Sequence, residues 1–459
     1  MKNNLIGENI VVRFAPSPTG LFHVGSARVA LYNYIFAKQH KGKLILRIED
    51  TDKERSKKEY EDDILSGMKW LGFSYDELYH QSERGSIYKK YIEKLIAEGK
   101  AYISKEIIDL NKERKGGMDQ VINLRNEVIR FKNPNKKVKF KDLIRGEIEF
   151  DTTDLGDFVI AKSFDEPIFH LVVVIDDFEM GVTHIIRGED HISNTPRHIL
   201  IQEAIGAPIP IYAHLPLILA EDRAKLSKRK HGEMTSVKYY ERMGYIPEAF
   251  SNFLSLVGWN SGTEQEIFSI DELIKLFNIS KVQKAGAIFN MEKLLWFNKE
   301  YIKKFPKERI ITEIKNRFPK EFQDEKIINK ISDLVVERIN IFSDIDKMVV
   351  DGDIQYYFEM PVISKEMIVW KKGGTIEQAK ENLSLISDIL NKISDKDFDL
   401  EKLKEKLMKF ADEKGKGNVL WPLRVALSGK EKSPDPFTLL FVLGKNESIN
   451  RIKKAVESI

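Results

Sequence analysis

One short segment near the N-terminus limits the possible folds more than any other part of the chain. Residues 9–16, NIVVRFAP, are rich in β-branched side chains and end at a proline, which predicts a buried strand. The proline-glycine turn that follows leads into apolar residues that recur at helical spacing from Val24 to Ile35. A strand, a tight turn and a helix in this order are typical of the beginning of a parallel α/β sheet.

The next segments repeat this alternation of strand and helix. Residues 43–50, KLILRIED, are predicted as a second strand. Ser56 and Glu59 have the spacing of a capping box, so we expect a helix to begin at Ser56 and to end near Gly72. This order favours a parallel sheet that is covered by helices.

The pattern changes in the middle of the chain and then resumes. Residues 101–168 form short, charged, strand-like segments, which indicates an inserted module that contains β-structure. HLVVVIDD (170–177) and VTHIIRGED (182–190) are predicted as further strands of the parallel sheet. Thr195 and Pro196 are expected to be the N-cap and the first residue of the helix that follows.

The composition excludes several classes of function. The chain has 459 residues, enough for about two to four domains, and its net charge of +3 neither requires nor excludes a nucleic-acid partner. It has no cysteine, which excludes disulfides, thiol nucleophiles and cysteine-based zinc sites. No apolar run has the length of a membrane span and the N-terminus lacks the pattern of a signal peptide, so we expect a cytoplasmic protein.

The turn after the first strand has the features of a phosphate site. In doubly wound folds, ligands bind at the carboxyl edge of the sheet, where this turn is expected to lie. Gly25, in the first helical turn, leaves backbone N–H groups accessible to an anion, which the helix dipole attracts. His23 precedes it and has a ring N–H to donate to a phosphate oxygen. A proline-glycine loop with an incidental histidine would, however, show the same spacing.

A second segment, KLSKRKH at residues 225–231, is strongly basic. It is expected to form a loop directly after a strand, where lysine side chains could hold the phosphates of a nucleotide. Their charge would stabilise the transition state as the phosphates leave. A solvated basic loop without a ligand would have the same composition.

HVGS and KLSKR, the central parts of these two segments, resemble the two signature motifs of the class I aminoacyl-tRNA synthetases. Longer stretches resemble the glutamyl-tRNA synthetase family in particular: RFAPSPTGLFHVGSARVALYNYIFA, LRIEDTD, VVIDD, THIIRGEDHISNTPRH and AKLSKRKHG. The similarity continues through EAFSNFLSLVGW, FNMEKLLWFNKEYI and PLRVALSG, so it spans essentially the whole chain.

The resemblance implies an α/β fold with a Rossmann-type catalytic domain, and nearly every segment beyond Ser236 has the spacing of helices. The expected parts are the two halves of the catalytic domain at 1–100 and 169–236, an inserted acceptor-binding module at 101–168, a helical stem-contact domain at 237–305 and a helical anticodon-binding domain at 306–459. Arg338 and Arg424 fall where the family presents side chains to the anticodon, although ordinary helix-surface arginines would fit equally well.

The resemblance also assigns site residues. The expected catalytic residues are His23, Lys225 and Lys228, and the expected ATP-binding residues add Gly25, Ser26 and Ser227. The expected glutamate-binding residues are Arg13, Ala15, Ser17, Glu49, Phe169 and Arg187. A planar guanidinium suits bidentate binding of a carboxylate, and a carboxylate suits the ammonium group of an amino acid.

Three departures from the family pattern matter. Ser26 replaces the last histidine of the first signature, as is usual for the glutamate-specific members. Phe169 replaces a tyrosine, so one polar contact is lost or is supplied by His170 or by water. The segment that holds a zinc knuckle in some members has no cysteine here, so we expect no metal site and no structural zinc.

The implied activity is the ATP-dependent ligation of L-glutamate to tRNA-Glu. Glutamate and ATP, with Mg²⁺ on the ATP phosphates, would form glutamyl-adenylate, and the terminal ribose hydroxyl of the tRNA would then take the glutamyl group. We expect a monomer without a membrane partner. Three alternatives remain open: a paralogue that is non-discriminating or directed to tRNA-Gln, a glutaminyl-tRNA synthetase, and an inert tRNA-binding module. The helical C-terminal region disfavours the glutaminyl enzyme, whose anticodon region is β-barrel in character.

Overall fold

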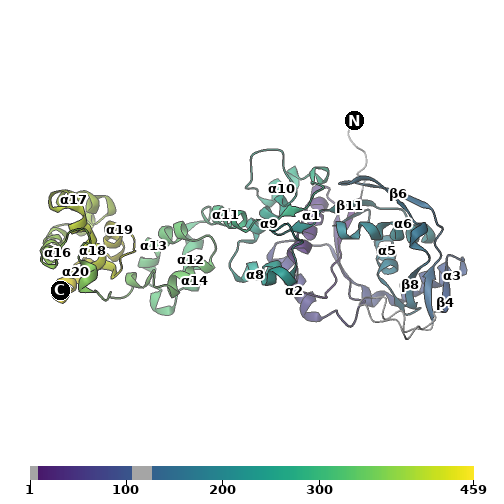
Figure 1. Ribbon diagram of the computed structural model, residues 1–459, viewed down its shortest axis with the longest axis horizontal. Coiled ribbons are helices and arrows are strands. Elements are labelled where there is room, and N and C mark those ends of the chain that lie inside the picture. The colour runs from purple at the N-terminus through teal and green to yellow at the C-terminus, as the bar shows by residue number, and fades with distance from the viewer. Residues whose placement is uncertain (1–8, 106–126) are drawn as a thin grey trace. The chain divides into compact units, whose positions relative to one another are not determined.

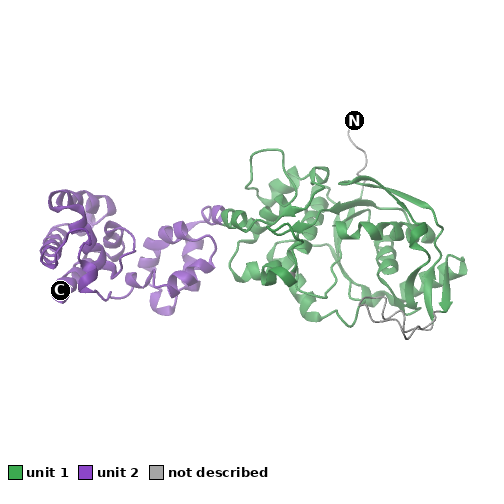
Figure 2. Ribbon diagram, viewed as in Figure 1, with its two compact units in different colours: residues 1–298 green, residues 299–459 purple. Residues whose placement is uncertain are grey.

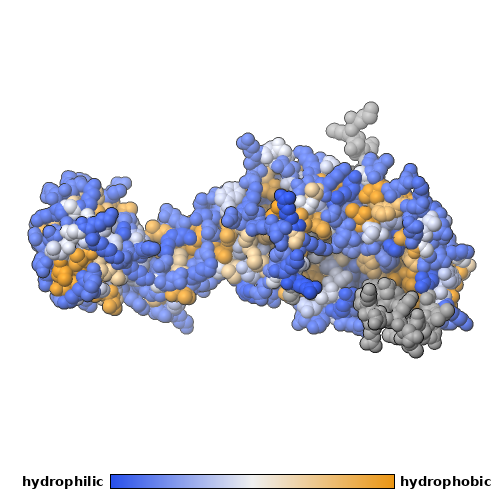
Figure 3. All heavy atoms as spheres, viewed as in Figure 1, coloured by the Kyte–Doolittle hydropathy of each residue, from blue (hydrophilic) through white to orange (hydrophobic). Residues whose placement is uncertain are grey.

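The computed structural model of the protein describes residues 9–105 and 127–459. The chain divides into two compact units, Met1–Asn298 and Lys299–Ile459, which Figure 2 shows in different colours. Hydrophilic residues cover most of the face shown in Figure 3, in keeping with a charged fraction of 32%. Within the described ranges, no helix is both long enough and apolar enough to cross a membrane.

The first unit is built on a central sheet to which seven strands of the described residues contribute, in the order β3-β2-β1-β10-β11-β6-β7. The strands are β1 Val11–Phe14, β2 Lys43–Ile48, β3 Glu77–His80, β6 Lys137–Asp142, β7 Gly146–Asp151, β10 His184–Gly188 and β11 Ile211–Leu215. Pairing is parallel from β3 to β6 and antiparallel between β6 and β7. The strand order reverses at β1, which is the position where doubly wound sheets bind ligands. The predicted Rossmann-type sheet is confirmed.

The segment at 101–168 contributes strands to two sheets. Its hairpin β6–β7 extends the central sheet beyond β11. Its remaining described strands form an antiparallel sheet of the order β4-β5-β8-β9, with β4 Ala101–Lys105, β5 Glu127–Phe131, β8 Phe158–Ser163 and β9 Glu166–Pro167. A short parallel pair, β12 Ile218–Leu219 and β13 Ala287–Ile288, lies after the central sheet in sequence.

The first unit also contains helices, some of which pack on the strands and others on neighbouring helices (Figure 1). They are α1 Val24–Gln39, α2 Lys58–Trp70, α3 Gly85–Ala97, α5 Phe169–Glu179, α6 Thr195–Ile205, α7 Lys228–His231, α8 Val237–Arg242, α9 Pro247–Leu256, α10 Ile270–Leu276 and α11 Met291–Ile302. α3, α5 and α6 share one buried apolar core with β10, β11 and the second sheet. α1 follows β1 directly, so its N-terminus lies at the carboxyl edge of the central sheet.

The prediction that HLVVVIDD is a strand is wrong, because this segment lies in helix α5. Every residue from Leu171 to Asp177 is buried, so this stretch shows no alternation of apolar and polar residues at helical spacing. An apolar run of this length is compatible with either a buried strand or a buried helix, and β-branched residues locally favour the strand. Packing against α3 and α6 decides in favour of the helix.

Two predicted helix caps also differ from the structure. α2 begins at Lys58, and the Ser56 hydroxyl makes no capping hydrogen bond because Ser56 still belongs to the preceding turn. Thr195 is the first residue of α6 and not its N-cap. Its hydroxyl instead accepts a hydrogen bond from Arg187, so this threonine belongs to the cleft described below.

In the second unit, the elements of the described chain are all helical, which confirms the prediction for this region. The longer helices are α12 Lys307–Arg317, α13 Glu325–Arg338, α14 Ser343–Val350, α15 Lys365–Ile368, α16 Ile376–Asn391, α17 Leu400–Lys414, α18 Lys416–Ser428, α19 Pro436–Leu443 and α20 Lys445–Ser458. Their buried faces carry leucine and isoleucine at helical spacing, for example Leu383, Ile386 and Leu390 in α16.

Candidate functional site

A cleft with a volume of about 550 Å³ lies at the carboxyl ends of β1, β2 and β10, where the strand order reverses. It brings together all but one of the residues that the sequence assigned to the ATP and glutamate sites: Arg13, Ala15, Ser17, His23, Gly25, Ser26, Glu49, Phe169, Arg187, Lys225 and Ser227. The exception is Lys228, whose side chain lies outside the part of the chain that the structure describes.

His23 is the N-cap of helix α1. Its backbone is extended, and its Nδ1 accepts a hydrogen bond from the Gly25 amide at 2.9 Å. Because Nδ1 is the acceptor, the ring hydrogen of the neutral imidazole is on Nε2, where it is available to a ligand. Burial and the nearby Lys225 ammonium lower the pKa of His23, which keeps the ring neutral near pH 7. The cleft therefore combines a helix N-terminus with one directed N–H donor.

Lys225 reaches the same cleft from the loop after β12. Backbone hydrogen bonds hold the base of this loop, with Leu226 N donating to Ile218 O at 3.0 Å. The Lys225 ammonium is 3.7 Å from Asp190 Oδ2, but both side chains are more than half exposed. Ion pairs this exposed contribute little to stability, so the lysine side chain is free to follow a ligand.

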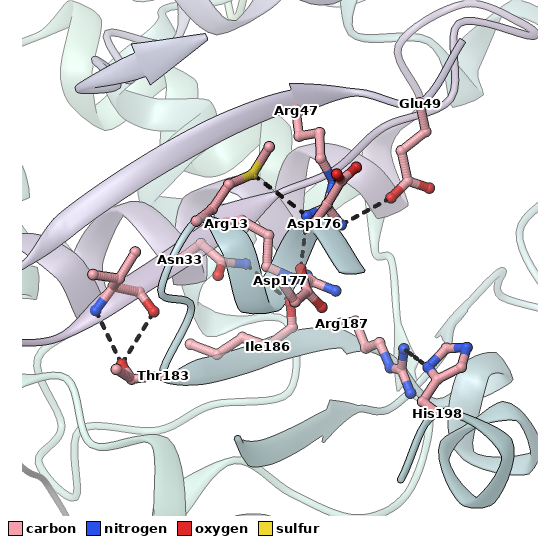
Figure 4. A network of polar contacts seen from close by, with 12 residues as sticks. Arg13, Asn33, Arg47, Glu49, Asp176, Asp177, Thr183, Ile186, Arg187 and His198 are labelled. Carbon is pink, nitrogen blue, oxygen red and sulfur yellow. Dashed lines mark hydrogen bonds and ion pairs between the residues drawn. The ribbon is translucent and has the colours of Figure 1, made fainter. Parts of the chain in front are cut away.

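Two arginines in the cleft region share one carboxylate (Figure 4). Asp177 Oδ1 accepts from Arg13 Nε at 3.2 Å and from Arg47 Nη1 at 2.7 Å. Burial alone would raise the pKa of Asp177, but the two guanidiniums outweigh burial and hold it below its usual value. This carboxylate therefore stays ionised and fixes Arg13 and Arg47 at the ends of neighbouring strands.

Glu49 follows β2 and lies at the rim of the same cluster. Its Oε1 accepts from Arg47 Nη2 at 3.1 Å, which orients the carboxylate toward the cleft. Burial raises the pKa of Glu49, although Arg47 and Arg13 oppose that effect. A cationic group bound in the cleft would favour the charged form of Glu49 in the same way.

Arg187 differs from Arg13 and Arg47 because its hydrogen-bond partners are neutral. The side chain is 5% exposed, and the described residues place no carboxylate within ion-pair distance of it. His214 Nε2, His198 Nδ1 and Thr195 Oγ1 accept its hydrogen bonds at 3.1, 3.2 and 2.7 Å. Burial lowers the pKa of Arg187 to about 10, so the guanidinium is still charged near pH 7.

Phe169 begins helix α5 and lines the cleft with its ring. It packs against the rings of His170, His191 and His198, with centroid separations of 5.5, 5.8 and 5.7 Å. His170 is not among the residues that line the cleft, and its Nδ1 contacts His198 Nε2 at 3.2 Å. Three histidine rings therefore pack around Phe169.

Sequence reasoning missed the residues that orient these groups. Arg47 stands two residues before Glu49 on a buried strand, and a charged residue in an otherwise apolar strand is a signal that could have identified it. Asp177 gives a similar signal, because it is a charged residue at the end of an otherwise apolar segment. His198 and His214 carry no local signal, because their roles depend on contacts between elements.

The two arginines predicted to read the anticodon lie in the second unit. Arg338 ends helix α13, forms an ion pair with Asp353 and is 43% exposed at its side chain. Arg424 lies in α18, and its Nε is buried without a hydrogen-bond partner in the structure. No group of three or more potential metal ligands occurs among the described residues.

Two family models together match nearly the whole chain. The model described as "tRNA synthetases class I (E and Q), catalytic domain" matches residues 9–122 and 109–296. The model described as "Anticodon binding domain" matches residues 294–456.

Curated relatives and solved structures are similar over almost their full length. The glutamate–tRNA ligase of Heliobacterium modesticaldum is 40% identical, with 98% of this chain and 97% of the relative covered. That of Aquifex aeolicus is also 40% identical, with 98% and 99% covered. The crystal structure of a glutamate tRNA ligase from Elizabethkingia meningosepticum, in complex with its amino acid, superposes with a TM-score of 0.86 at 35% identity and covers 98% of this chain and 100% of that one.

Proposed function

This chain belongs to the class I tRNA synthetases for glutamate and glutamine, and on that basis we propose that it joins L-glutamate to tRNA-Glu in an ATP-dependent reaction. The full-length similarity to glutamate–tRNA ligases supports glutamate as the amino acid. In the structure, Arg187 supports the proposal most directly. Its buried guanidinium lines the cleft and has only neutral hydrogen-bond partners. Such a group favours a ligand that brings its own carboxylate.

ATP binds at the N-terminal end of helix α1 in this proposal. The N-terminal end of helix α1 at Ser26 faces the phosphates, and the Nε2 hydrogen of His23 donates to a phosphate oxygen, while the Gly25 amide is held by His23 Nδ1. Lys225 and Lys228 stabilise the charge on the departing pyrophosphate, with Ser227 beside them. Mg²⁺ enters as part of the substrate, bound to the ATP phosphates.

Glutamate binds beside ATP with its three charged groups separated. Arg187 takes the side-chain carboxylate, and Glu49 takes the ammonium group. Arg13, Ala15, Ser17 and Phe169 line the space between them, and Arg13 is held by Asp177. The α-carboxylate is then left to attack the α-phosphate, which gives glutamyl-adenylate and pyrophosphate by positioning alone, without a protein nucleophile.

The tRNA contacts are assigned to the remaining parts of the chain. We propose that residues 101–168 hold the acceptor end, 237–305 contact the stem, and 306–459 bind the anticodon, with Arg338 and Arg424 among the contacts. The terminal ribose hydroxyl of the tRNA attacks the activated carbonyl of the adenylate, which forms the ester bond of glutamyl-tRNA, breaks the bond between the carbonyl and the phosphate, and releases AMP. The chain has no cysteine, and we propose that it binds no structural zinc, which metal analysis of the purified protein would test.

The proposal is tested by pyrophosphate release from ATP with purified full-length protein and tRNA-Glu. We expect release with L-glutamate, and at most trace release with L-glutamine or L-aspartate. An inert tRNA-binding protein would bind the tRNA and release nothing with any amino acid. Release with glutamine in preference to glutamate would assign the chain to the other amino acid of its family.

A further inference from the structure

Three neutral side chains hold Arg187 along different sides of its guanidinium. Nε donates to His214 Nε2, Nη1 donates to His198 Nδ1, and Nη2 donates to Thr195 Oγ1. A guanidinium has only donors, so the two ring nitrogens that face it must be unprotonated. The N–H donors of Arg187 thus fix the tautomer of both histidines.

His214 is held in its tautomer by a buried carboxylate. With Nε2 accepting, the ring hydrogen is on Nδ1, which donates to Asp142 Oδ2 at 2.7 Å. Asp142 is 1% exposed and also accepts from the amides of Ile144 and Arg145 at 2.9 and 2.8 Å. The register of the sheet pairs Arg187 directly with His214, which places the two side chains on the same face.

His198 is held in its tautomer from the opposite side. Its Nδ1 accepts from Arg187, so its Nε2 carries the hydrogen and donates to His170 Nδ1 at 3.2 Å. His198 lies on α6 and is 1% exposed, whereas His170 lies on α5 and is partly exposed. The packing of two helices therefore sets the position of this ring.

The histidines around Arg187 stay neutral. Burial lowers the pKa values of His198 and His214, and burial together with nearby arginines lowers that of His170 to about 4. Arg13 and Arg47 show the contrasting arrangement, since both form ion pairs with Asp177, and Arg47 also pairs with Glu49. Within the described chain, Arg187 is also held by three side-chain hydrogen bonds, but no carboxylate forms an ion pair with it.

We propose that His198 and His214 are positioning residues that select glutamate over glutamine by acting through Arg187. They fix the plane of the guanidinium without neutralising it, so a ligand carboxylate supplies the missing negative charge. A glutamine carboxamide would leave a buried cation without a counter-charge, which is strongly unfavourable. This inference rests on the proposed function, because it explains amino-acid choice in that same cleft.

The test compares two substitutions of nearly equal shape that differ in charge, His198→Gln and His198→Glu, in the full-length protein. The Gln amide oxygen is again a neutral acceptor for Arg187, so we expect most of the glutamate affinity to remain. The carboxylate of His198→Glu would neutralise Arg187, so we expect the KM for glutamate to rise about 100-fold with the KM for ATP nearly unchanged. The preference for glutamate over glutamine should fall by a similar factor in His198→Glu alone.

A folded His198→Glu protein that keeps its glutamate KM and its preference for glutamate would overturn the inference. A similar loss in His198→Gln and His198→Glu would also overturn it, because charge would then not be the cause. If circular dichroism shows that His198→Glu does not fold, His170→Leu tests the same chain of hydrogen bonds from His170 through His198 to Arg187. This variant removes the acceptor that fixes the His198 tautomer, so the KM for glutamate should rise about fivefold at constant KM for ATP. No rise would overturn the inference.

The proposed function fails in a different way. A wild-type protein that releases no pyrophosphate with glutamate would contradict the proposed function itself. An active wild type together with variants that discriminate normally would contradict only the role given to His198 and His214.

Discussion

The imidazole of His23 and the amide of Gly25 form the hydrogen bond that begins helix α1, with Nδ1 accepting at 2.9 Å. The same ring therefore has two functions, one through each nitrogen. Nδ1 satisfies an otherwise unpaired N–H of the first helical turn, and Nε2–H is directed at the ligand cleft. Gly25 suits this geometry, because a Cβ at that position would lie only 3.3 Å from His23 Nδ1.

The two functions of His23 can be separated by substitution. His23→Ala should lower the free energy of unfolding by about 1 kcal/mol, because the helix loses its cap. It should also slow glutamyl-adenylate formation by about 10²–10³, because the donor to the phosphate is lost. His23→Asn keeps a good capping group, so stability should return while the rate stays low. Urea unfolding and pyrophosphate exchange measure the two effects, and a normal rate in His23→Asn would contradict the catalytic role.

The ion pairs of Asp177 should make stability depend on pH. Asp177→Asn leaves Arg13 without its carboxylate and weakens the binding of Arg47, so the free energy of unfolding should fall by about 3–5 kcal/mol near pH 7. Because the folded-state pKa of Asp177 is lowered, its contribution is fully present above the unfolded pKa of about 4 and is lost as the pH falls through the folded pKa. The difference between wild type and Asp177→Asn should therefore shrink below about pH 4. If the difference in the free energy of unfolding between wild type and Asp177→Asn did not change with pH, the ion pairs of Asp177 would not be the cause of the lost stability.

Arg187→Lys should weaken the binding of glutamate much more than the binding of ATP. Lysine keeps the positive charge but lacks the planar fork that holds a carboxylate and that His198 and His214 orient. We expect the Kd for glutamate to rise about 10- to 100-fold and the Kd for ATP to change little. Calorimetric titration with each ligand checks this expectation, and equal losses for both ligands would indicate a purely structural arginine.

A shortened chain that ends at Lys304, just after helix α11, should retain the binding of ATP and glutamate. All residues of the cleft lie in the unit Met1–Asn298, which has its own core. The same chain should lose the preference for tRNA-Glu over a tRNA with a changed anticodon, because residues 294–456 match an anticodon-binding domain. Filter binding of both tRNAs measures this preference. An undiminished preference would show that the helical region does not read the anticodon.

Much of the cleft could be predicted because its residues stand in continuous motifs. Arg13 lies in β1, and His23 and Gly25 stand at the start of the helix that follows it, so a strand, a turn and a helix fix their arrangement locally. The carboxyl ends of parallel strands meet at one edge of a sheet, so Glu49 and Arg187 are expected at the same edge. The structure places all five of these residues in one cleft.

The groups that orient Arg187 could not be predicted in this way. Asp142 and His214 are 72 residues apart and meet because β6 pairs with β11, which no local pattern specifies. His170 meets His198 only because its segment is a helix, and a continuous apolar run does not distinguish a buried helix from a buried strand. Long-range pairing and tertiary packing, and not local propensity, therefore determine the surroundings of Arg187.

The reaction proposed for this chain is the formation of glutamyl-tRNA-Glu from glutamate, ATP and tRNA-Glu. The most direct measurement is the charging of purified tRNA-Glu and tRNA-Gln, in separate reactions, with radiolabelled L-glutamate and ATP. We expect ATP-dependent attachment of glutamate to tRNA-Glu, with little or none on tRNA-Gln. Charging of tRNA-Gln at an equal or higher rate would contradict the tRNA assignment, and a failure of folded full-length protein to charge either tRNA would contradict the proposed function.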